Sequence, residues 1–107
     1  MTYTLTVLYP HETDANYNID YYVSNHMSLV ERHWKKYGVQ SWSVNRFNPA
    51  VDGTRPRYTF GCIIVWESEE SVQRAFNGPE SAAVLEDIPK FSNKQPTFLF
   101  GESVAMA

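Results

Sequence analysis

A histidine in the first third of the chain is the first candidate for chemistry. His26 lies among apolar residues that recur at spacings of three and four, between Tyr22 and Val30. This spacing predicts that its side chain points from the apolar face of a helix into the layer between helix and sheet. A neutral imidazole there can act as general base or acid near pH 7 without a large pKa shift. The alternative is a core histidine whose nitrogens bond a backbone carbonyl and a tyrosine hydroxyl.

A carboxylate and several aromatic residues could assist this imidazole. Asp87 ends a later helical region, and if that end folds toward the mouth of the sheet it could orient His26 or act as a second acid–base group. The alternative is an exposed carboxylate, or a turn-forming one that bonds nearby backbone. Tyr22 could stabilise a developing oxyanion through its phenol. Six further residues suit the walls of an aromatic substrate pocket, or else form core and dimer contacts: Tyr9, Trp42, Tyr58, Phe60, Trp66 and Phe98.

The other histidines and the cysteine do not point to metal or thiol chemistry. His33 lies two helical turns after His26, roughly 10 Å along the axis, and this spacing matches no zinc motif. We expect His33 at the rim or surface, and His11 in a solvated loop. Cys62 has no basic neighbour in the sequence, which predicts an inert buried thiol. The sequence also lacks GxSxG, Walker and GxGxxG motifs, so no metal and no organic cofactor are expected.

Length, charge and hydropathy restrict the remaining possibilities. The chain has 107 residues, which suits a single domain over residues 1–107. Its 12 acidic and 9 basic residues argue against a nucleic-acid partner. No run approaches the roughly 20 apolar residues that span a bilayer, and the first ten residues do not resemble a signal peptide. We therefore expect a cytoplasmic protein with no membrane partner and a small-molecule substrate.

Periodicity and capping signals predict the elements that must position these residues. Apolar and polar residues alternate over residues 3–9, before Pro10, which indicates a strand. The helical spacing extends over residues 19–37, with Asn18 as N-cap and Gly38 after the end. Further on we expect strands at 39–47, 58–66 and 97–102, a turn-rich connection at 48–57, a helix at 69–77 capped by Ser68, and helical turns at 80–87 stopped by Pro89.

The predicted order βαββαβ is that of the α+β ferredoxin-like sandwich. Two helices cover only one face of a four-stranded sheet. The strand at 58–66 is apolar on both sides, so we expect both of its faces to be buried. In so short a chain the simplest cover for the other face is a second copy. The pattern therefore predicts a homodimer whose sheets pack face to face.

Two stretches of the sequence carry motifs that go beyond the prediction of helices and strands. The first, LTVLYP followed by YNIDYYVSNHMSLVERHWKKYG, has a Tyr-Pro strand end, a Tyr-Tyr pair and a histidine four residues on: Tyr9, Pro10, Tyr21, Tyr22 and His26. The second, VLEDIPKFSNKQPTFLFGE, has Asp87, Phe91 and Glu102. The first stretch resembles the helix motif of the EthD domain, named for a protein of ethyl tert-butyl ether degradation, and the second resembles the end of that domain. The resemblance spans nearly the whole chain and implies a dimeric α/β barrel of ferredoxin-like protomers.

Three functions fit these observations. The first is a cofactor-independent lyase of dehydratase or cyclase type, in which His26 transfers protons on a small hydrophobic oxygenated molecule, Tyr22 holds the oxyanion, and Asp87 orients the imidazole or protonates the leaving hydroxyl. The second is a cofactor-free monooxygenase or an accessory protein of an oxidative degradation pathway. The third is a dimer that binds a small molecule without catalysis. The resemblance is compatible with all three, because the wider superfamily includes quinol-forming monooxygenases, cyclases, dehydratases and some haem-degrading enzymes.

Overall fold

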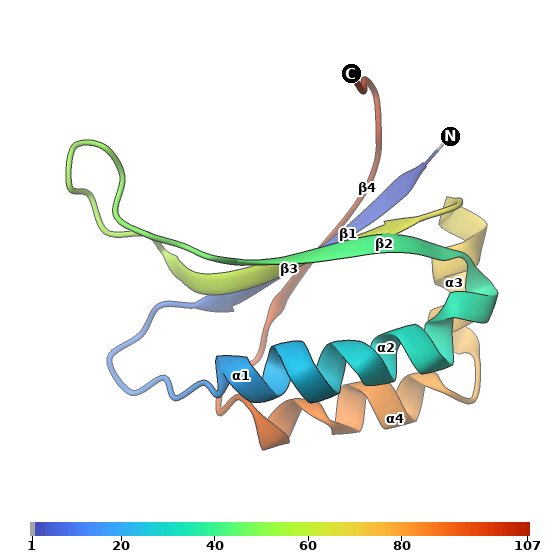
Figure 1. Cartoon of the computed structure of the whole chain (residues 1–107), viewed down its shortest axis with the longest axis horizontal. Coiled ribbons are helices and arrows are strands. Elements are labelled where there is room, and N and C mark those ends of the chain that lie inside the picture. Colours follow the sequence, from blue (N-terminus) through green and yellow to red (C-terminus); the bar gives the residue numbers. More distant parts are fainter. Residues whose placement is uncertain (1) are drawn as a thin grey trace.

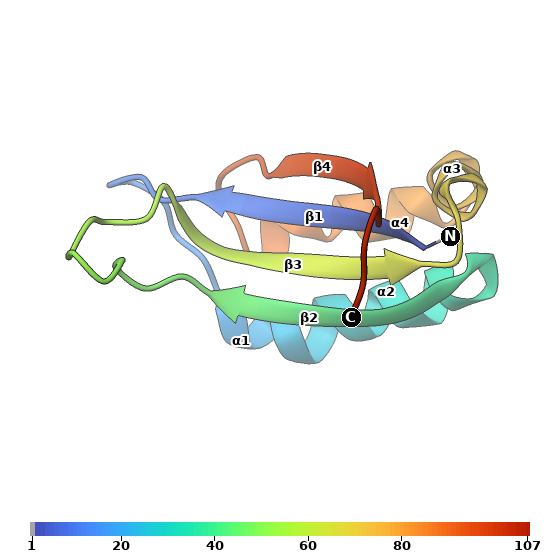
Figure 2. The same ribbon diagram turned by 90° about the horizontal axis from the view of Figure 1, so that it is seen from above.

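A four-stranded antiparallel sheet forms one layer of the protein in a computed structural model that describes residues 2–107 (Figure 1). The strands lie in the order β2-β3-β1-β4, which Figure 2 shows from above. Every neighbouring pair is antiparallel. The strands are β1 (Tyr3–Pro10), β2 (Val39–Arg46), β3 (Tyr58–Trp66) and β4 (Thr97–Glu102).

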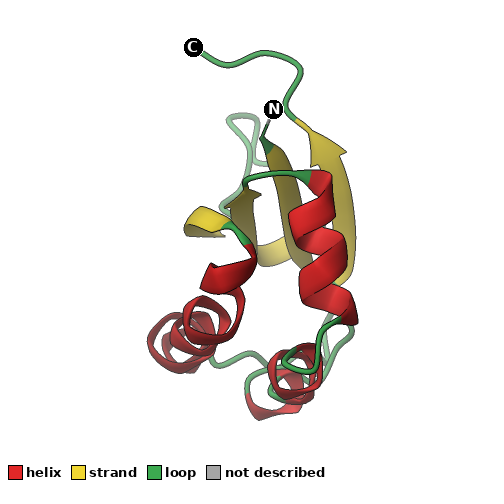
Figure 3. Ribbon diagram, turned by 90° about the vertical axis from the view of Figure 1, so that its right-hand side faces the viewer, coloured by secondary structure: helices red, strands yellow, loops and turns green. Residues whose placement is uncertain are grey.

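The helices form a second layer on one face of this sheet (Figure 3). The first is a continuous helix made of four consecutive segments: α1 (Ile19–Tyr21), the π-helical η1 (Tyr22–His26), α2 (Met27–Trp34) and the 3₁₀ turn η2 (Lys35–Tyr37). The second group consists of α3 (Glu69–Asn77), α4 (Ser81–Glu86) and the 3₁₀ turn η3 (Ile88–Lys90). Among the described residues, no helix is long and apolar enough to cross a membrane.

Capping residues fix the ends of the helices as the sequence predicts. The Asn18 side chain accepts a hydrogen bond from the Tyr21 backbone N–H at 3.0 Å. Ser68 caps α3 in the same way, accepting from the Ser71 N–H at 3.2 Å. Gly38 follows η2 with φ of 120°, a left-handed conformation that a residue without Cβ adopts readily.

The core lies between the two layers, against the helix-facing side of the sheet. It is built from alternate residues of the strands, which agrees with the period-2 pattern of the sequence. Leu5, Val7 and Tyr9 of β1 are buried there with alternate residues of β3. In the single chain the opposite face is open, because Ile63 is 38% and Leu99 is 53% exposed. The prediction that β3 is buried on both faces is therefore not met without a second chain.

The βαββαβ order and the α+β fold class are confirmed, with small differences at element ends. Strand β2 ends at Arg46, one residue before the predicted end at Phe47. Pro89 does not stop the helical region, because it is the second residue of η3. Proline fits there since the first turn of a helix needs no intrahelical bond from its N–H groups.

Candidate functional site

A hydrogen-bonded chain with a buried His26–Asp87 pair joins the first helix to the end of α4. His26 Nδ1 lies 3.0 Å from Asp87 Oδ2, and both side chains are only 7% exposed. The Tyr21 hydroxyl donates to the other carboxylate oxygen of Asp87 at 2.9 Å. Lys90 Nζ lies 3.6 Å from that same oxygen. The structure thus brings together His26 and Asp87, which are 61 residues apart in the chain.

The π-helical segment explains why Tyr21 and His26 reach the same carboxylate. In a regular α-helix of 3.6 residues per turn, residues five apart point about 140° away from each other. In η1 the Met27 N–H instead bonds the Tyr22 carbonyl, five residues back. This wider turn brings residues five apart onto the same side of the helix. Such single π turns are frequent at functional sites.

The surroundings of the pair hold His26 neutral and Asp87 ionised. Burial lowers the pKa of His26, and the hydrogen bond and charge of Asp87 offset this only in part. Burial would raise the pKa of Asp87, but hydrogen bonds from His26 and Tyr21 together outweigh it and leave that pKa below its usual value. An ionised carboxylate only accepts hydrogen bonds, so Nδ1 carries the imidazole proton. His26 Nε2 therefore keeps a free lone pair.

Aromatic rings surround the other side of the imidazole. The Tyr22 ring stacks on it with centroids 5.2 Å apart, and the Phe91 ring lies 4.7 Å away. Beyond Tyr22, the rings of Tyr9 and Phe60 stack 4.5 Å apart. Burial raises the pKa of Tyr9 and of Tyr22, so both phenols stay protonated near neutral pH.

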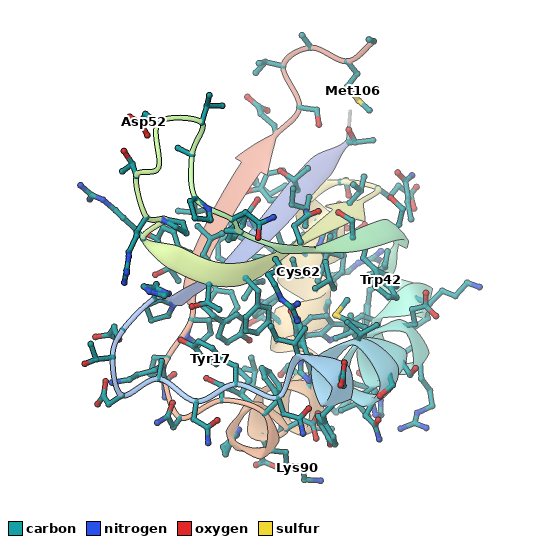
Figure 4. All side chains as sticks on the ribbon, turned by 60° about the vertical axis from the view of Figure 1, so that its left-hand side comes forward. Tyr17, Trp42, Asp52, Cys62, Lys90 and Met106 are labelled. Carbon is teal, nitrogen blue, oxygen red and sulfur yellow. The ribbon has the colours of Figure 1, made fainter. Side chains whose placement is uncertain are left out.

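The thiol of Cys62 lies in this same layer between sheet and helices (Figure 4). Burial raises its pKa to about 11, so the thiolate is not formed near pH 7. The predicted burial of Cys62 is confirmed. The Tyr22 hydroxyl interacts with both Cys62 and Tyr9, and these hydrogen bonds offset part of the rise that burial causes in the pKa of each neighbour.

Three of the predicted pocket walls do not meet His26. Trp66 pairs with Tyr3 at the opposite end of β1 from Tyr9 and packs on Trp34, with ring centroids 5.5 Å apart. Phe98 contacts Phe76 of α3. In Figure 4 Trp42 lies on the opposite side of the view from Tyr17, and its indole N–H donates to Glu31 at 2.7 Å.

Tyr58 lies at the same end of the sheet as Phe60 and is half-buried, opposite Pro10. His33 is half-buried on α2, whereas His11 is exposed, with Nδ1 3.2 Å from the Thr59 hydroxyl. Within residues 2–107 no group of three or more His, Cys, Asp or Glu side chains is placed to hold a metal ion. The residues grouped around the candidate site are therefore His26, Asp87 and Tyr22, with Tyr9 and Phe60 behind them.

Two residues of the site were not assigned a role from the sequence. Tyr21 is the phenol bonded to Asp87, and helical periodicity alone assigns the inner position to its neighbour Tyr22. Phe91 lines a pocket of about 640 Å³ at this end of the protein and also contacts the His26 ring. The resemblance to the EthD pattern included both residues, but the sequence gives no sign of which side chains they touch.

Comparisons with known proteins place the chain in a family. An EthD-like protein from Ralstonia eutropha JMP134 is 21% identical with a TM-score of 0.88, over 99% of this chain and 95% of that chain. An ethyl tert-butyl ether degradation (EthD) family protein from Bacillus halodurans C-125 is 23% identical with a TM-score of 0.75, over 97% of this chain and 100% of that one. At these identities the likeness shows the fold alone.

Structures of lower sequence identity are also similar in fold. SnoaB, a cofactor-independent oxygenase from Streptomyces nogalater, is 12% identical with a TM-score of 0.57, over 98% of this chain and 94% of that chain. Other similar structures are described as dimeric proteins of ferredoxin-like fold. No curated protein matches the sequence. The model of the EthD domain matches residues 10–95, and this chain therefore belongs to the EthD domain family.

Proposed function

We propose that the protein is a cofactor-independent enzyme that transfers protons on a small hydrophobic molecule carrying a carbonyl group. The observation that supports this most is the hydrogen-bonded Tyr21–Asp87–His26 chain, in which the His26–Asp87 pair is buried. It fixes one tautomer of the imidazole and leaves Nε2 as a base, an arrangement that enzymes use for general base catalysis.

The reaction begins at a carbon next to the carbonyl group. His26 Nε2 takes a proton from this carbon, and the electron pair of the broken C–H bond moves onto the carbonyl oxygen through the enolate. Asp87 stabilises the imidazolium that forms, as in other Asp–His pairs. The Tyr22 phenol, which stays protonated, is the candidate donor to the enolate oxygen.

In a dehydration the enolate expels a hydroxyl group from the next carbon. The imidazolium of His26 returns its proton to this hydroxyl, which leaves as water, and the base is regenerated. Asp87 is an unsuitable proton donor because its pKa is lowered. Its role in this proposal is orientation of the imidazole, one of the two roles that the sequence left open.

Substrate must pass Phe91 to reach the imidazole. The pockets at this end of the protein are lined by Phe91 and by Asp87, and not by His26 itself. The Phe91 ring lies between the larger pocket and His26. The ring is only 2% exposed, so in this proposal it moves aside together with the side chains packed on it when substrate enters.

Proton abstraction can be tested before the natural substrate is identified. Wild-type protein is incubated in D₂O with a panel of aryl ketones and β-hydroxyketones, and deuterium uptake next to the carbonyl is followed by NMR. We expect uptake above the buffer rate for at least one compound and a loss of about 100-fold or more in His26→Gln, the usual contribution of a general base. His33→Gln is the matched control and should exchange at the wild-type rate.

Either of two results would contradict this function. Equal rates in wild type and His26→Gln would remove the base from the mechanism. No exchange with any compound that binds would favour the non-catalytic alternative, which the low exposure of His26 also supports.

A cofactor-free oxygenase is the second candidate. Its support is the likeness of fold to SnoaB. The same base would deprotonate an electron-rich phenol or quinol, whose anion then reacts with O₂. Oxygen consumption during turnover, measured with an electrode, separates the two candidates because proton transfer alone consumes none.

We also propose that two copies of the chain pack through the open faces of their sheets. Similar structures are dimeric. The open face carries exposed apolar residues on two strands, Ile63 and Leu99, and Phe47 lies over Gly61 on the same side. Paired residues of neighbouring strands share a face, so this dimer leaves the helix-facing side, with His26, unobstructed.

A further inference from the structure

The pocket of about 640 Å³ is open at the end of the sandwich where β1 and β2 finish. Its volume lies within the range of sites for small molecules. One wall is the segment before the first helix, another is the segment after η3, and the third is a single side chain of the sheet. The lining residues are residues 16–20, residues 89–93 and Arg46.

Hydrogen bonds hold the first two walls together. An isolated antiparallel bridge pairs Tyr17 with Ser92. The Asn18 N–H donates to the Phe91 carbonyl at 2.9 Å. The Asn16 N–H donates to the Asn93 side-chain oxygen at 2.8 Å. The walls of the pocket are therefore fixed before any ligand arrives, which lowers the cost of binding.

The third wall places a cation on the helix-facing side of the sheet. Arg46 pairs with Phe60 across β2 and β3, and Phe60 pairs with Tyr9 across β3 and β1. Directly paired residues share a face, so all three project toward the helices in one row. The row leads from the edge of the sheet at Arg46 to the aromatic rings around His26.

Arg46 has no ion-pair partner within residues 2–107, in contrast to several lysines. Lys94 lies 2.8 Å from Asp14, Lys36 pairs with Glu80, and Lys90 contacts Asp87. A guanidinium offers donors in a planar fork that matches a carboxylate. Two other charged residues line the pocket, Lys90 and Asp20. The cation of Lys90 attracts a bound anion, and the carboxylate of Asp20 repels it.

We propose that this pocket binds the carboxylate of a small, otherwise apolar acid, and that Arg46 is the residue that recognises it. The apolar part of the acid lies against Tyr17 and Phe91, on the side of the pocket nearest His26. The placement of the apolar part beside His26 rests on the proposed function. The carboxylate contact stands on the pocket and the free guanidinium alone.

Binding of a matched pair of probes tests the proposal. Titration calorimetry measures 2-naphthoate and its neutral amide, 2-naphthamide, on wild type, Arg46→Gln and Arg74→Gln. Arg74 is an exposed arginine of α3 outside this pocket and serves as the control. We expect 2-naphthoate to bind about ten-fold more tightly than the amide, as a charge-assisted hydrogen bond supports, and Arg46→Gln to remove this preference. Arg74→Gln should keep it.

A third variant tests whether a negative charge in the pocket weakens binding of the acid. Asp20→Asn removes the opposing charge and should strengthen binding of 2-naphthoate while leaving the amide unchanged. The proposal is wrong if the acid and the amide bind wild type equally, if neither binds, or if Arg74→Gln reduces acid binding as much as Arg46→Gln does.

Failure of the pocket and failure of the catalytic proposal are distinguishable. His26→Gln should keep the preference for 2-naphthoate over the amide, because the imidazole does not touch the carboxylate in this arrangement. Intact binding with no deuterium exchange would contradict catalysis alone. Exchange that depends on His26 but not on a carboxylate in the substrate would contradict the role of Arg46 alone.

Discussion

Two opposing influences set the proton affinity of His26. Burial disfavours the imidazolium, and the ionised carboxylate of Asp87 favours it. Burial is the larger influence, so the pKa is below the usual 6.5 of histidine. The imidazole is therefore already a free base at neutral pH. Its carboxylate partner still stabilises the cation that forms when a proton is taken up, which is what catalysis requires.

Asp87→Asn separates these two influences. The substitution removes the charge that favours the imidazolium and leaves burial in place, so the pKa of His26 should fall further below 6.5. The amide can also donate to Nδ1, which should move the imidazole proton to Nε2 in part of the molecules. ¹⁵N-detected NMR of the imidazole during a pH titration reads both the pKa and the tautomer.

Tyr21→Phe is the matched control for that titration. It removes one hydrogen bond from Asp87 but keeps its charge, so the pKa of His26 should change less than in Asp87→Asn. A His26 pKa that rises in Asp87→Asn would show that the carboxylate does not stabilise the cation.

The chemistry of these residues could be predicted from the sequence only in part. His26 and Asp87 could be proposed because their types suit acid–base work, but 60 residues separate them and no local pattern shows that they meet. The hydrogen-bonding role of Tyr21 could not be predicted at all. An α-helical spacing places Tyr22 on the inner face with His26, and α and π turns are built from the same residue types, so periodicity does not reveal a π turn.

At the scale of elements, strong local signals predict the boundaries well. The N-caps Asn18 and Ser68 and the alternation of β1 and β3 each have a direct physical cause, and the structure has these elements where the signals place them. The differences fall where two rules compete. Pro89 reads as a helix breaker, yet it also suits the first turn of η3.

Gly38 connects the first helix to β2. Its replacement tests how strongly the fold depends on the backbone conformation and the close packing at this position. Its φ of 120° is strained for any residue with a Cβ. An added Cβ would also lie 2.6 Å from the Ser71 hydroxyl oxygen of α3. We expect Gly38→Ala to lower the free energy of unfolding by about 1–3 kcal/mol, measured by urea denaturation.

Gly101→Ala is the control for this measurement. A Cβ at Gly101 meets nothing within 4 Å, and its φ is not positive. Its effect should therefore stay within about 0.5 kcal/mol, the usual range for a surface substitution. Equal losses in both variants would mean that neither the conformation nor the contact with Ser71 matters at Gly38.

At the scale of the whole molecule, the two faces of the sheet differ in what covers them. The helix-facing side is filled by the core and by the candidate site. The open side has threonine and serine positions between its apolar ones, and the C-terminal tail after β4 extends on this side in Figure 1. Exposed apolar residues continue into the C-terminal tail, at Val104 and Met106. A second copy would cover the sheet without disturbing the pocket beside Arg46.

A charge placed on the open face tests this dimer. Ile63→Glu puts a carboxylate in the centre of the proposed interface, where pairing of the two sheets would bury it without a partner. Sedimentation velocity should show a dimer for wild type and a monomer for Ile63→Glu. Leu85→Glu is the control, because Leu85 is equally exposed at 38% but belongs to α4 in the other layer. This control should remain dimeric. A monomeric wild type would mean that the proposed dimer does not form. A dimer that survives Ile63→Glu would place the contact elsewhere than on the open face of the sheet.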